Sequence, residues 1–286
     1  MGKVKQVLQM IKFEHSVFAL PFALMSAFLA EKQSPSFNKL LWIIVAMVSA
    51  RSAAMAFNRI ADLKYDRINP RTLNWPLPKG ELSINFVIVF IIVSVSIFFI
   101  SAYLLNKICF YLSPIALFII ITYSYSKRFS FMTHFHLGLS LSLAPMGAWL
   151  AITEHFHPIP VLISTSVILW VAGFDILYAT QDIDFDKKNR LHSIPVQFGI
   201  RNSLIISSVC HAIMIIPLII VYFIADLGLF YLLGIIIASV FLIRQHAIVA
   251  PNNLSRVNEA FFTLNGLLSV SLFIFTALDI SMHYKI

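Results

Sequence analysis

Charged side chains are scarce in this sequence, and acidic ones are the scarcest. Charged residues make up 12% of the 286 residues, with 13 Asp and Glu against 21 Lys and Arg. Hydrophobic residues account for 59% of the chain, above the roughly 45–50% that is usual in soluble proteins. So few polar side chains cannot cover a water-soluble globule. The composition therefore excludes a soluble protein and predicts an all-α, polytopic membrane protein.

Several common functional motifs are also missing. The two cysteines, Cys109 and Cys210, lie in apolar stretches without Cys-x-x-Cys spacing, which indicates neither a disulfide framework nor a zinc site. The sequence has no Walker motif, no Gly-x-Gly-x-x-Gly and no nucleophile elbow. Nucleotide binding through these loops and α/β-hydrolase chemistry are therefore not indicated.

Nine apolar stretches have the length of a membrane-spanning helix, which needs about 20 mainly apolar residues. They are Phe13–Ala30, Leu40–Phe57, Leu82–Leu105, Ile108–Tyr123, Leu137–Ile152, Ile159–Ala179, Leu204–Ile224, Leu227–Ile243 and Ala260–Ile280. The fourth, fifth and eighth are short, so we expect them to be tilted, broken or extended. Glu14 and His15 interrupt the start of the first stretch, which predicts a retained helix rather than a signal peptide. We expect residues 1–286 to form one transmembrane domain of nine helices around a central cavity.

The basic residues predict the orientation in the membrane. With the N-terminus in the cytoplasm, most of the 21 Lys and Arg residues fall on the cytoplasmic side, and Arg51 lies within the second span. The other side holds only Lys32, Lys39, Lys107 and Lys285. By the positive-inside rule, the N-terminus is cytoplasmic and the C-terminus lies outside. The same bias, with anionic lipid, accounts for the basic loops without a nucleic-acid partner.

Nearly half of the 13 acidic residues lie at two places on the predicted cytoplasmic face. These are Asp62 and Asp66 after the second span, and Asp175, Asp182, Asp184 and Asp186 at the end of the sixth span and beyond. If helical geometry continues, a spacing of four residues stacks two side chains about 6 Å apart on one face. The same offset of 120 residues separates Asp62 from Asp182 and Asp66 from Asp186. An internal duplication of four helices would explain that offset.

Each acidic pair extends into a polar stripe, because Asn58 lies one turn before Asp62 and Tyr178 one turn before Asp182. Stacked carboxylates repel each other unless a positive charge lies between them. Mg²⁺ suits such a site, since it binds oxygen ligands and keeps places for water and a substrate phosphate. The alternative is a set of solvated loop charges neutralised by neighbouring Lys and Arg. Two equivalent stripes on one face favour two metal clusters that hold one anion.

Arg51 lies two turns before Asn58, and Asp175 lies two turns before Asp182. An arginine inside an apolar helix faces the bundle interior, a cavity or a partner. Two interpretations remain open at this point. Arg51 and Asp175 form a buried salt bridge, or Arg51 is a deep cation that receives a carboxylate or phenolate from a ligand.

Three segments of the chain carry a family resemblance. They are Asn58-Arg59-Ile-Ala-Asp62-Leu-Lys-Tyr-Asp66-Arg-Ile-Asn69-Pro70-Arg71-Thr72 with Pro76-Leu-Pro78-Lys-Gly80, then Tyr123-Ser-Tyr-Ser-Lys127-Arg128, and Asp175-Ile-Leu-Tyr178-Ala-Thr-Gln181-Asp182-Ile-Asp184-Phe-Asp186 with Leu191-His192-Ser193-Ile194-Pro195. Together they resemble the UbiA superfamily of intramembrane prenyltransferases, especially the bacterial 4-hydroxybenzoate polyprenyltransferases and their menaquinone-pathway relatives. One departure is Trp75, which stands where relatives commonly have Arg, and which we interpret as a residue of the membrane interface.

The resemblance implies Mg²⁺-dependent transfer of a polyprenyl chain from its diphosphate to a small aromatic acid, 4-hydroxybenzoate above all. That reaction belongs to ubiquinone biosynthesis and would place the protein in a bacterial inner membrane. The implied metal ligands are Asn58, Asp62, Asp66, Asp182 and Asp186, and the implied diphosphate ligands are Lys127, Arg59, Arg71 and Tyr123. Arg51 and Tyr178 would bind the aromatic acceptor, and Arg51 and Asp175 would be catalytic, with Asp175 orienting the phenol or taking a proton. The abundant Phe residues are candidates for lining the isoprenoid berth.

Three alternatives remain. In the first, the acceptor is a dihydroxynaphthoate of a menaquinone pathway. In the second, the acceptor is haem, although the first motif has Asn-Arg where haem-type relatives tend to have Asn-Asp. Outside the enzyme class, Arg51 and Asp175 line the path of a small-solute or ion transporter. Two histidine pairs, His134-x-His136 and His155-x-His157, are interpreted as loop residues on opposite faces, without the i,i+4 spacing of a helical metal site.

Overall fold

The computed structural model describes residues 2–283, and within them the chain is helical, with one isolated bridge between Ala250 and Asn253. Nine helices of this part of the chain are long and apolar enough to cross a membrane, as the sequence predicts. The long helices are α2 (Ser16–Glu31), α3 (Phe37–Ala61), α5 (Ile84–Leu105), α6 (Lys107–Ser126), α7 (Thr133–Thr153), α8 (Pro158–Ala179), α10 (Ile194–Ile224), α11 (Leu229–Ala247) and α12 (Asn265–His283). Lys285, expected on the outer side, lies beyond the described residues.

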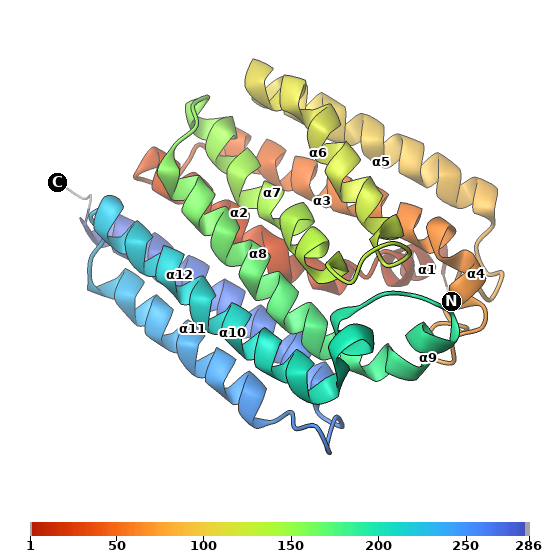
Figure 1. The fold of residues 1–286 in the computed structure, drawn as a ribbon. Coiled ribbons are helices and arrows are strands. Elements are labelled where there is room, and N and C mark those ends of the chain that lie inside the picture. The colour runs from red at the N-terminus through yellow and green to blue at the C-terminus, as the bar shows by residue number, and fades with distance from the viewer. Residues whose placement is uncertain (1, 284–286) are drawn as a thin grey trace.

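Short helices occupy the connections between the long ones. They are α1 (Lys3–Met10), η1 (Phe13–His15), α4 (Leu63–Asp66), η2 (Thr180–Asp182), α9 (Ile183–Lys188) and the π-helical segment η3 (Glu259–Leu264). Figure 1 shows α4 and α9 at the same end of the bundle as α1, so both acidic motifs lie at one end of the molecule.

The predicted short spans are complete helices with polar ends. Asn106 caps α6, because its side-chain oxygen accepts a hydrogen bond from the Cys109 amide at 2.8 Å. The largest boundary difference is in the seventh span, which begins at Ile194 rather than Leu204. Ser193 caps this helix and Pro195 occupies its first turn, where proline is well tolerated. Hydropathy missed this first part because Gln197, Arg201 and Asn202 interrupt the apolar run. The helix is also bent at Gly199.

The long helices pack in two groups that share α2 and α7 (Figure 1). In the first, α2, α7, α8, α10, α11 and α12 pack against one another in a closed ring. Its interior is filled by large side chains, among them Trp170, Phe174 and Tyr231. In the second, α3, α5 and α6 pack together and against α2 and α7. The cavity described below lies in this second group.

The two acidic motifs share a backbone feature. Helix α3 ends at Asp62, whose φ and ψ are −96° and 7°, and the turn that follows α8 ends at Asp182, with −104° and 6°. A short helix begins immediately after each residue. The amide of Asp66 still bonds the Asp62 carbonyl at 2.9 Å, so the expected helical spacing survives the break. The same break at both motifs agrees with the predicted duplication.

Candidate active site

Every carboxylate of the two Asp-x3-Asp pairs contacts a basic side chain. The pairs are Asp62 with Arg128 at 3.3 Å, Asp66 with Arg59 at 3.4 Å, Asp182 with Arg71 at 2.9 Å, and Asp186 with Lys127 at 3.2 Å. Three of these bases were predicted as diphosphate ligands. Arg128 was missed, although its place beside Lys127 in the segment Tyr123–Arg128 was a usable signal.

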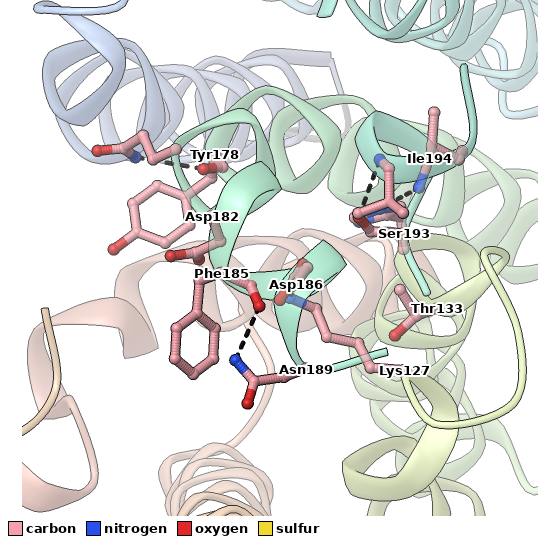
Figure 2. Close-up of polar contacts among 12 residues, drawn as sticks. Lys127, Thr133, Tyr178, Asp182, Phe185, Asp186, Asn189, Ser193 and Ile194 are labelled. Atoms are coloured by element: carbon pink, nitrogen blue, oxygen red, sulfur yellow. Dashed lines mark hydrogen bonds and ion pairs between the residues drawn. The ribbon is translucent and has the colours of Figure 1, made fainter. Parts of the chain in front are cut away.

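The turn between α6 and α7 joins the two acidic motifs. Lys127 reaches Asp186 of α9 (Figure 2), while the next residue, Arg128, reaches Asp62 and donates to the Ala61 carbonyl at 2.6 Å. The Lys127 carbonyl in turn accepts a bond from the His192 amide at 2.7 Å. Charges far apart in the sequence therefore form one cluster at the end of the bundle.

The carboxylates of this cluster form two separate pairs, Asp62 with Asp66 and Asp182 with Asp186, and each pair is a candidate for binding one metal ion. Within residues 2–283, no group of three or more His, Cys, Asp or Glu side chains is arranged to hold a metal ion. Asn58 lies against Asp62, with its amide nitrogen 2.9 Å from the carboxylate. The donors are all oxygens, as Mg²⁺ prefers, and pairs leave positions for water and phosphate. The residues present thus fit two Mg²⁺ ions, provided that the basic partners move aside.

Burial sets the protonation of the cluster. It raises the pKa of the Asp62 and Asp66 carboxyls, although the Arg59 guanidinium beside both acts to lower it. Burial alone would lower the pKa of Lys127, but the carboxylates of Asp186 and Asp182 outweigh it, and the pKa is raised. Lys127 therefore stays cationic at neutral pH. The two carboxyls depend on nearby positive charge to remain ionised.

Trp75 is part of this cluster. Its ring lies 4.2 Å from the Arg59 guanidinium carbon and 5.3 Å from the Lys12 ammonium, both measured to the ring centroid. These are cation–π distances. The ring of Trp75 therefore packs on a cation of the site, and its place at the membrane interface stays a prediction.

An apolar cavity of about 200 Å³ extends between α2, α3, α5, α6 and α7. Its polar lining includes Arg51, Asn58 and Tyr123, and Asn58 connects it to the acidic cluster. The expectation that Phe lines the berth is wrong, since Phe98 is the one Phe among the lining residues. The walls are rich in alanine instead: Ala19, Ala23, Ala46, Ala50, Ala54, Ala102, Ala116, Ala144 and Ala148. Small side chains leave the space that phenylalanine would fill.

Arg51 and Asp175 do not pair with each other. Arg51 donates from Nη2 to the Lys12 carbonyl at 3.3 Å, and its Nε is buried without a hydrogen-bond partner. Asp175 instead lies 2.6 Å from Nδ1 of His134. The salt-bridge interpretation is wrong, because α8 packs against α7, which carries His134, while Arg51 lies on α3. The second interpretation, in which Arg51 is a deep cation, agrees with the structure, since Arg51 forms no ion pair with any residue that the structure describes.

His134 and His136 were wrongly interpreted as loop residues, since both lie in α7. His134 lies in the first turn of this helix and is fully buried. Its Nε2 accepts a bond from the Ile194 amide at 3.2 Å, so the ring proton is on Nδ1 and is donated to Asp175. Hydropathy alone placed the helix start at Leu137, and this error hid the contact.

The two tyrosines of the predicted site lie apart from each other. Tyr123 lines the cavity. Tyr178 stacks on Phe261, with ring centroids 4.2 Å apart, and lies 4.9 Å beneath Arg71. Tyr178 therefore joins the acidic cluster through Arg71, and no described contact joins it to Arg51.

The model of the UbiA prenyltransferase family matches residues 19–267. The chain belongs to this family. It is therefore a multi-pass membrane prenyltransferase. The matched residues include both the acidic cluster and the lining of the cavity.

Individual UbiA relatives agree with this assignment. A 4-hydroxybenzoate octaprenyltransferase of Vibrio atlanticus (strain LGP32) is 30% identical over 230 residues, which cover 78% of each chain. The apo structure of a UbiA homologue from Aeropyrum pernix K1 is 34% identical, with a TM-score of 0.84 over 94% of this chain and 98% of that one. A UbiA homologue from Archaeoglobus fulgidus, solved with GPP and Mg²⁺, shares the fold at 22% identity and a TM-score of 0.74, covering 96% and 99% of the two chains.

Proposed function

We propose that this enzyme transfers a polyprenyl chain from polyprenyl diphosphate to 4-hydroxybenzoate, in a Mg²⁺-dependent step of ubiquinone biosynthesis. One observation carries the proposal: a cluster of four acid–base pairs lies at the polar end of an apolar cavity that Arg51 also lines, and Arg51 forms no ion pair within the described part of the chain. The Vibrio relative is named for this acceptor, and the Archaeoglobus homologue binds a prenyl diphosphate and Mg²⁺.

The acidic cluster is the proposed diphosphate site. Asn58, Asp62 and Asp66 would hold one Mg²⁺, and Asp182 and Asp186 the other. Bound there, the metal neutralises charge on the leaving diphosphate. The four basic side chains would then leave the carboxylates and bind phosphate oxygens instead. These side chains are Arg59, Arg71, Lys127 and Arg128, and Tyr123 would lie near them. The buried Nε atoms of Arg59 and Arg128 lack partners, which supports an anionic ligand at this place.

The acceptor would lie between Arg51 and Asp175. Arg51 would bind its carboxylate, since a buried guanidinium favours a paired anion. Asp175 would accept the hydrogen bond of the phenol, because the proton on His134 Nδ1 occupies one carboxylate oxygen and leaves the other for a ligand. Tyr178 would complete the acceptor side from its position under Arg71.

The reaction would proceed by ionisation and aromatic substitution. The allylic carbon–oxygen bond breaks and its electron pair leaves with the diphosphate. Ring electrons ortho to the hydroxyl form the new carbon–carbon bond, and the ring proton passes to a base, for which Asp175 is the candidate. The apolar cavity would hold the isoprenoid tail and keep water from the cation.

We further propose that residues 1–286 form one domain in a bacterial inner membrane, with the N-terminus in the cytoplasm and the C-terminus outside. The asymmetry of Lys and Arg supports this orientation. Diphosphate and aromatic acids are cytoplasmic metabolites, and the acidic cluster lies at the end of the bundle that carries α1 (Figure 1).

The test is pyrophosphate release by purified protein in detergent with Mg²⁺ and geranyl diphosphate. The acceptors 4-hydroxybenzoate and 1,4-dihydroxy-2-naphthoate are supplied in parallel to wild type, Asp62→Ala and Asp182→Ala. We expect release that depends on 4-hydroxybenzoate and falls by at least about 100-fold in both variants, because each removes a charged ligand of the diphosphate site. The matched control is Asp184→Ala, since Asp184 is exposed and makes no ion pair with any described residue.

The outcomes separate the alternatives. Release with the naphthoate alone would replace the acceptor and keep the rest of the proposal. Unchanged activity in Asp62→Ala or Asp182→Ala would remove the acidic cluster from the reaction. No release with either acceptor, from folded protein, would contradict the proposed function and favour haem or the transporter.

A further inference from the structure

His15 is a half-buried histidine to which the proposed reaction assigns no role. Its ring packs against three phenylalanine rings, with centroids 5.3 Å from Phe18, 5.5 Å from Phe261 and 5.4 Å from Phe262. The side chain forms no hydrogen bond with any residue that the structure describes. Aromatic packing therefore fixes the position of the imidazole, while its nitrogen atoms remain available to a ligand.

His15 lies at the polar end of the cavity. Its φ and ψ of −76° and −2° continue α2 backward by one residue. Ala19 and Ala23, four and eight residues further along this helix, both line the cavity. Residues four apart lie on one face of a helix, so His15 is on the cavity face of α2. It is one turn nearer than Ala19 to the end of the bundle that carries α1 and the acidic motifs (Figure 1).

The backbone carbonyl of Lys12 connects His15 to Arg51. This carbonyl accepts a hydrogen bond from the His15 amide at 2.9 Å and another from Arg51 Nη2 at 3.3 Å. Lys12 has φ of 49° and ψ of 56°, in the left-handed region that is uncommon for residues other than glycine. The guanidinium of Arg51 is also close enough to act electrostatically on the His15 ring. A strained turn thus holds the start of α2 against the deep cation of α3, and such strain is concentrated at functional sites.

The two side chains supply hydrogen-bond donors at one place. Nε of Arg51 is buried without a partner among the described residues, and a histidine ring has at least one N–H in either of its protonation states. The carboxylate of Glu14, next to His15 in the sequence, is 50% exposed and lies 4.0 Å from the Lys12 ammonium instead. An imidazole N–H and a guanidinium beside each other suit a ligand with two acceptor oxygens on one carbon, which is a carboxylate.

We propose that His15, together with Arg51, binds the carboxylate of the aromatic acceptor and so selects carboxylic acids over neutral phenols. The inference rests on the proposed function, which places the acceptor carboxylate at Arg51. The His15 N–H donates to one carboxylate oxygen and the guanidinium donates to the other. The diphosphate of the donor binds at the acidic cluster, so His15 affects the affinity for the acceptor and not that for the donor.

The first test measures kinetics with 4-hydroxybenzoate and with its methyl ester, in wild type, His15→Phe, His15→Asn and His15→Gln. Phenylalanine keeps the aromatic packing and removes the N–H. We expect His15→Phe to raise the KM for 4-hydroxybenzoate about 10-fold or more, as for a lost hydrogen bond to a charged group, and to keep the KM for geranyl diphosphate within about twofold. The value of kcat/KM for the ester should stay unchanged, so the preference for the acid decreases.

Conservative variants and a matched control exclude a purely structural effect. Asparagine places an N–H near the position of imidazole Nδ1 and glutamine near that of Nε2, so one of these two variants should recover most of the preference for the acid. His155→Phe makes the same chemical change at an exposed position and should behave as wild type. Equal loss of activity with the acid and the ester, or a change confined to the KM for the donor, would overturn the role of His15.

Binding of the acceptor separates this inference from the proposed function. Equilibrium dialysis measures the affinity for radiolabelled 4-hydroxybenzoate in detergent, with Mg²⁺ and geranyl thiolodiphosphate, which resists ionisation. We expect His15→Phe to bind at least about 10-fold more weakly than wild type. This difference in a protein without turnover would contradict the proposed function and still support the carboxylate site. Turnover by wild type, together with equal affinity in His15→Phe, would overturn the role of His15 and leave the proposed function in place.

Discussion

At the scale of single residues, buried arginine Nε atoms mark the site. Five buried side-chain polar atoms in the described part of the chain lack a hydrogen-bond partner, and three of them are Nε of Arg51, Arg59 and Arg128. An unpaired buried donor costs about 1–3 kcal/mol, and more when it is charged. In the proposed function these donors would give hydrogen bonds to anionic ligands, a diphosphate at Arg59 and Arg128 and a carboxylate at Arg51.

His134 gives a prediction at the same scale. Its Nδ1 proton holds Asp175, so His134→Leu should leave this carboxylate without its donor and lower kcat roughly 10- to 100-fold, as loss of a supporting hydrogen bond does elsewhere. The KM for the prenyl diphosphate should stay unchanged, because the acidic cluster does not involve His134. Steady-state kinetics with varied donor and acceptor provide the measurement.

The conservative variant separates orientation from folding. His134→Asn keeps an N–H near the Nδ1 position and should recover a large part of kcat, whereas His155→Asn, at an exposed position, should behave as wild type. If His134→Leu and His134→Asn lose activity equally while both stay folded, the hydrogen bond to Asp175 has no role in the reaction.

At the scale of helices, interruptions position the functional groups. The bridge conformations of Asp62 and Asp182 end one helix and begin another. Beyond these breaks, the carboxylate of Asp66 pairs with Arg59 of the preceding helix α3, and the carboxylate of Asp186 pairs with Lys127 of the turn between α6 and α7. Helix α10 is bent at Gly199, with φ of 76° and ψ of 168°. Its first turn supplies the Ile194 amide that fixes the His134 ring. Regular helices through these points would separate the groups.

The bend predicts a difference between two glycines. The backbone of Gly199 occupies a region that is open essentially only to glycine, so Gly199→Ala should destabilise the protein by about 1–3 kcal/mol. Gly147→Ala should stabilise it by about 0.5–1 kcal/mol, since that glycine is in a regular helix with free space around it. Thermal unfolding in detergent measures both. If both substitutions shift the unfolding temperature equally and in the same direction, the backbone at Gly199 and that at Gly147 do not differ in their need for glycine.

At the scale of the whole molecule, the two helix groups have different contents. The closed ring around Trp170 is filled with large side chains, and the group of α3, α5 and α6 contains the alanine-lined cavity. The acidic cluster lies at the end where the loops of both groups meet (Figure 1). A densely filled half and a hollow half, with charge at one end, suit the proposed reaction between a polar acceptor and a donor with a lipid tail.

Orientation gives the prediction at this scale. In a variant with Cys109 and Cys210 replaced by serine, Lys107→Cys should react with a membrane-impermeant maleimide on intact cells. Lys187→Cys should react only after the membrane is permeabilised, because it lies beside the acidic cluster. Both lysines are exposed, so access depends on the side of the membrane. The reverse pattern would invert the proposed topology.

The sequence alone was enough to predict the nine helices, the two acidic stripes and the family. Each of these depends on local properties: runs of apolar residues as long as a bilayer, and carboxylates four residues apart on a helix. Lys127 of the segment Tyr123–Arg128 was likewise predicted, whereas the neighbouring Arg128 was missed. Helix ends were less accurate, because caps such as Ser193 and the bend at Gly199 do not change hydropathy.

Tertiary structure decided which of these groups meet. Lys127 and Asp186 are 59 residues apart in the sequence, and His134 and Asp175 are 41 apart. Their contacts depend on which helices pack together, and so does the lack of an ion pair between Arg51 and any described residue. The cavity follows the same rule, since its alanines come from five helices and no single segment shows that their small side chains face one space. The sequence by itself determines the type and the helical spacing of the functional residues. Which charges form pairs, and where a cavity remains, depends on how the helices pack.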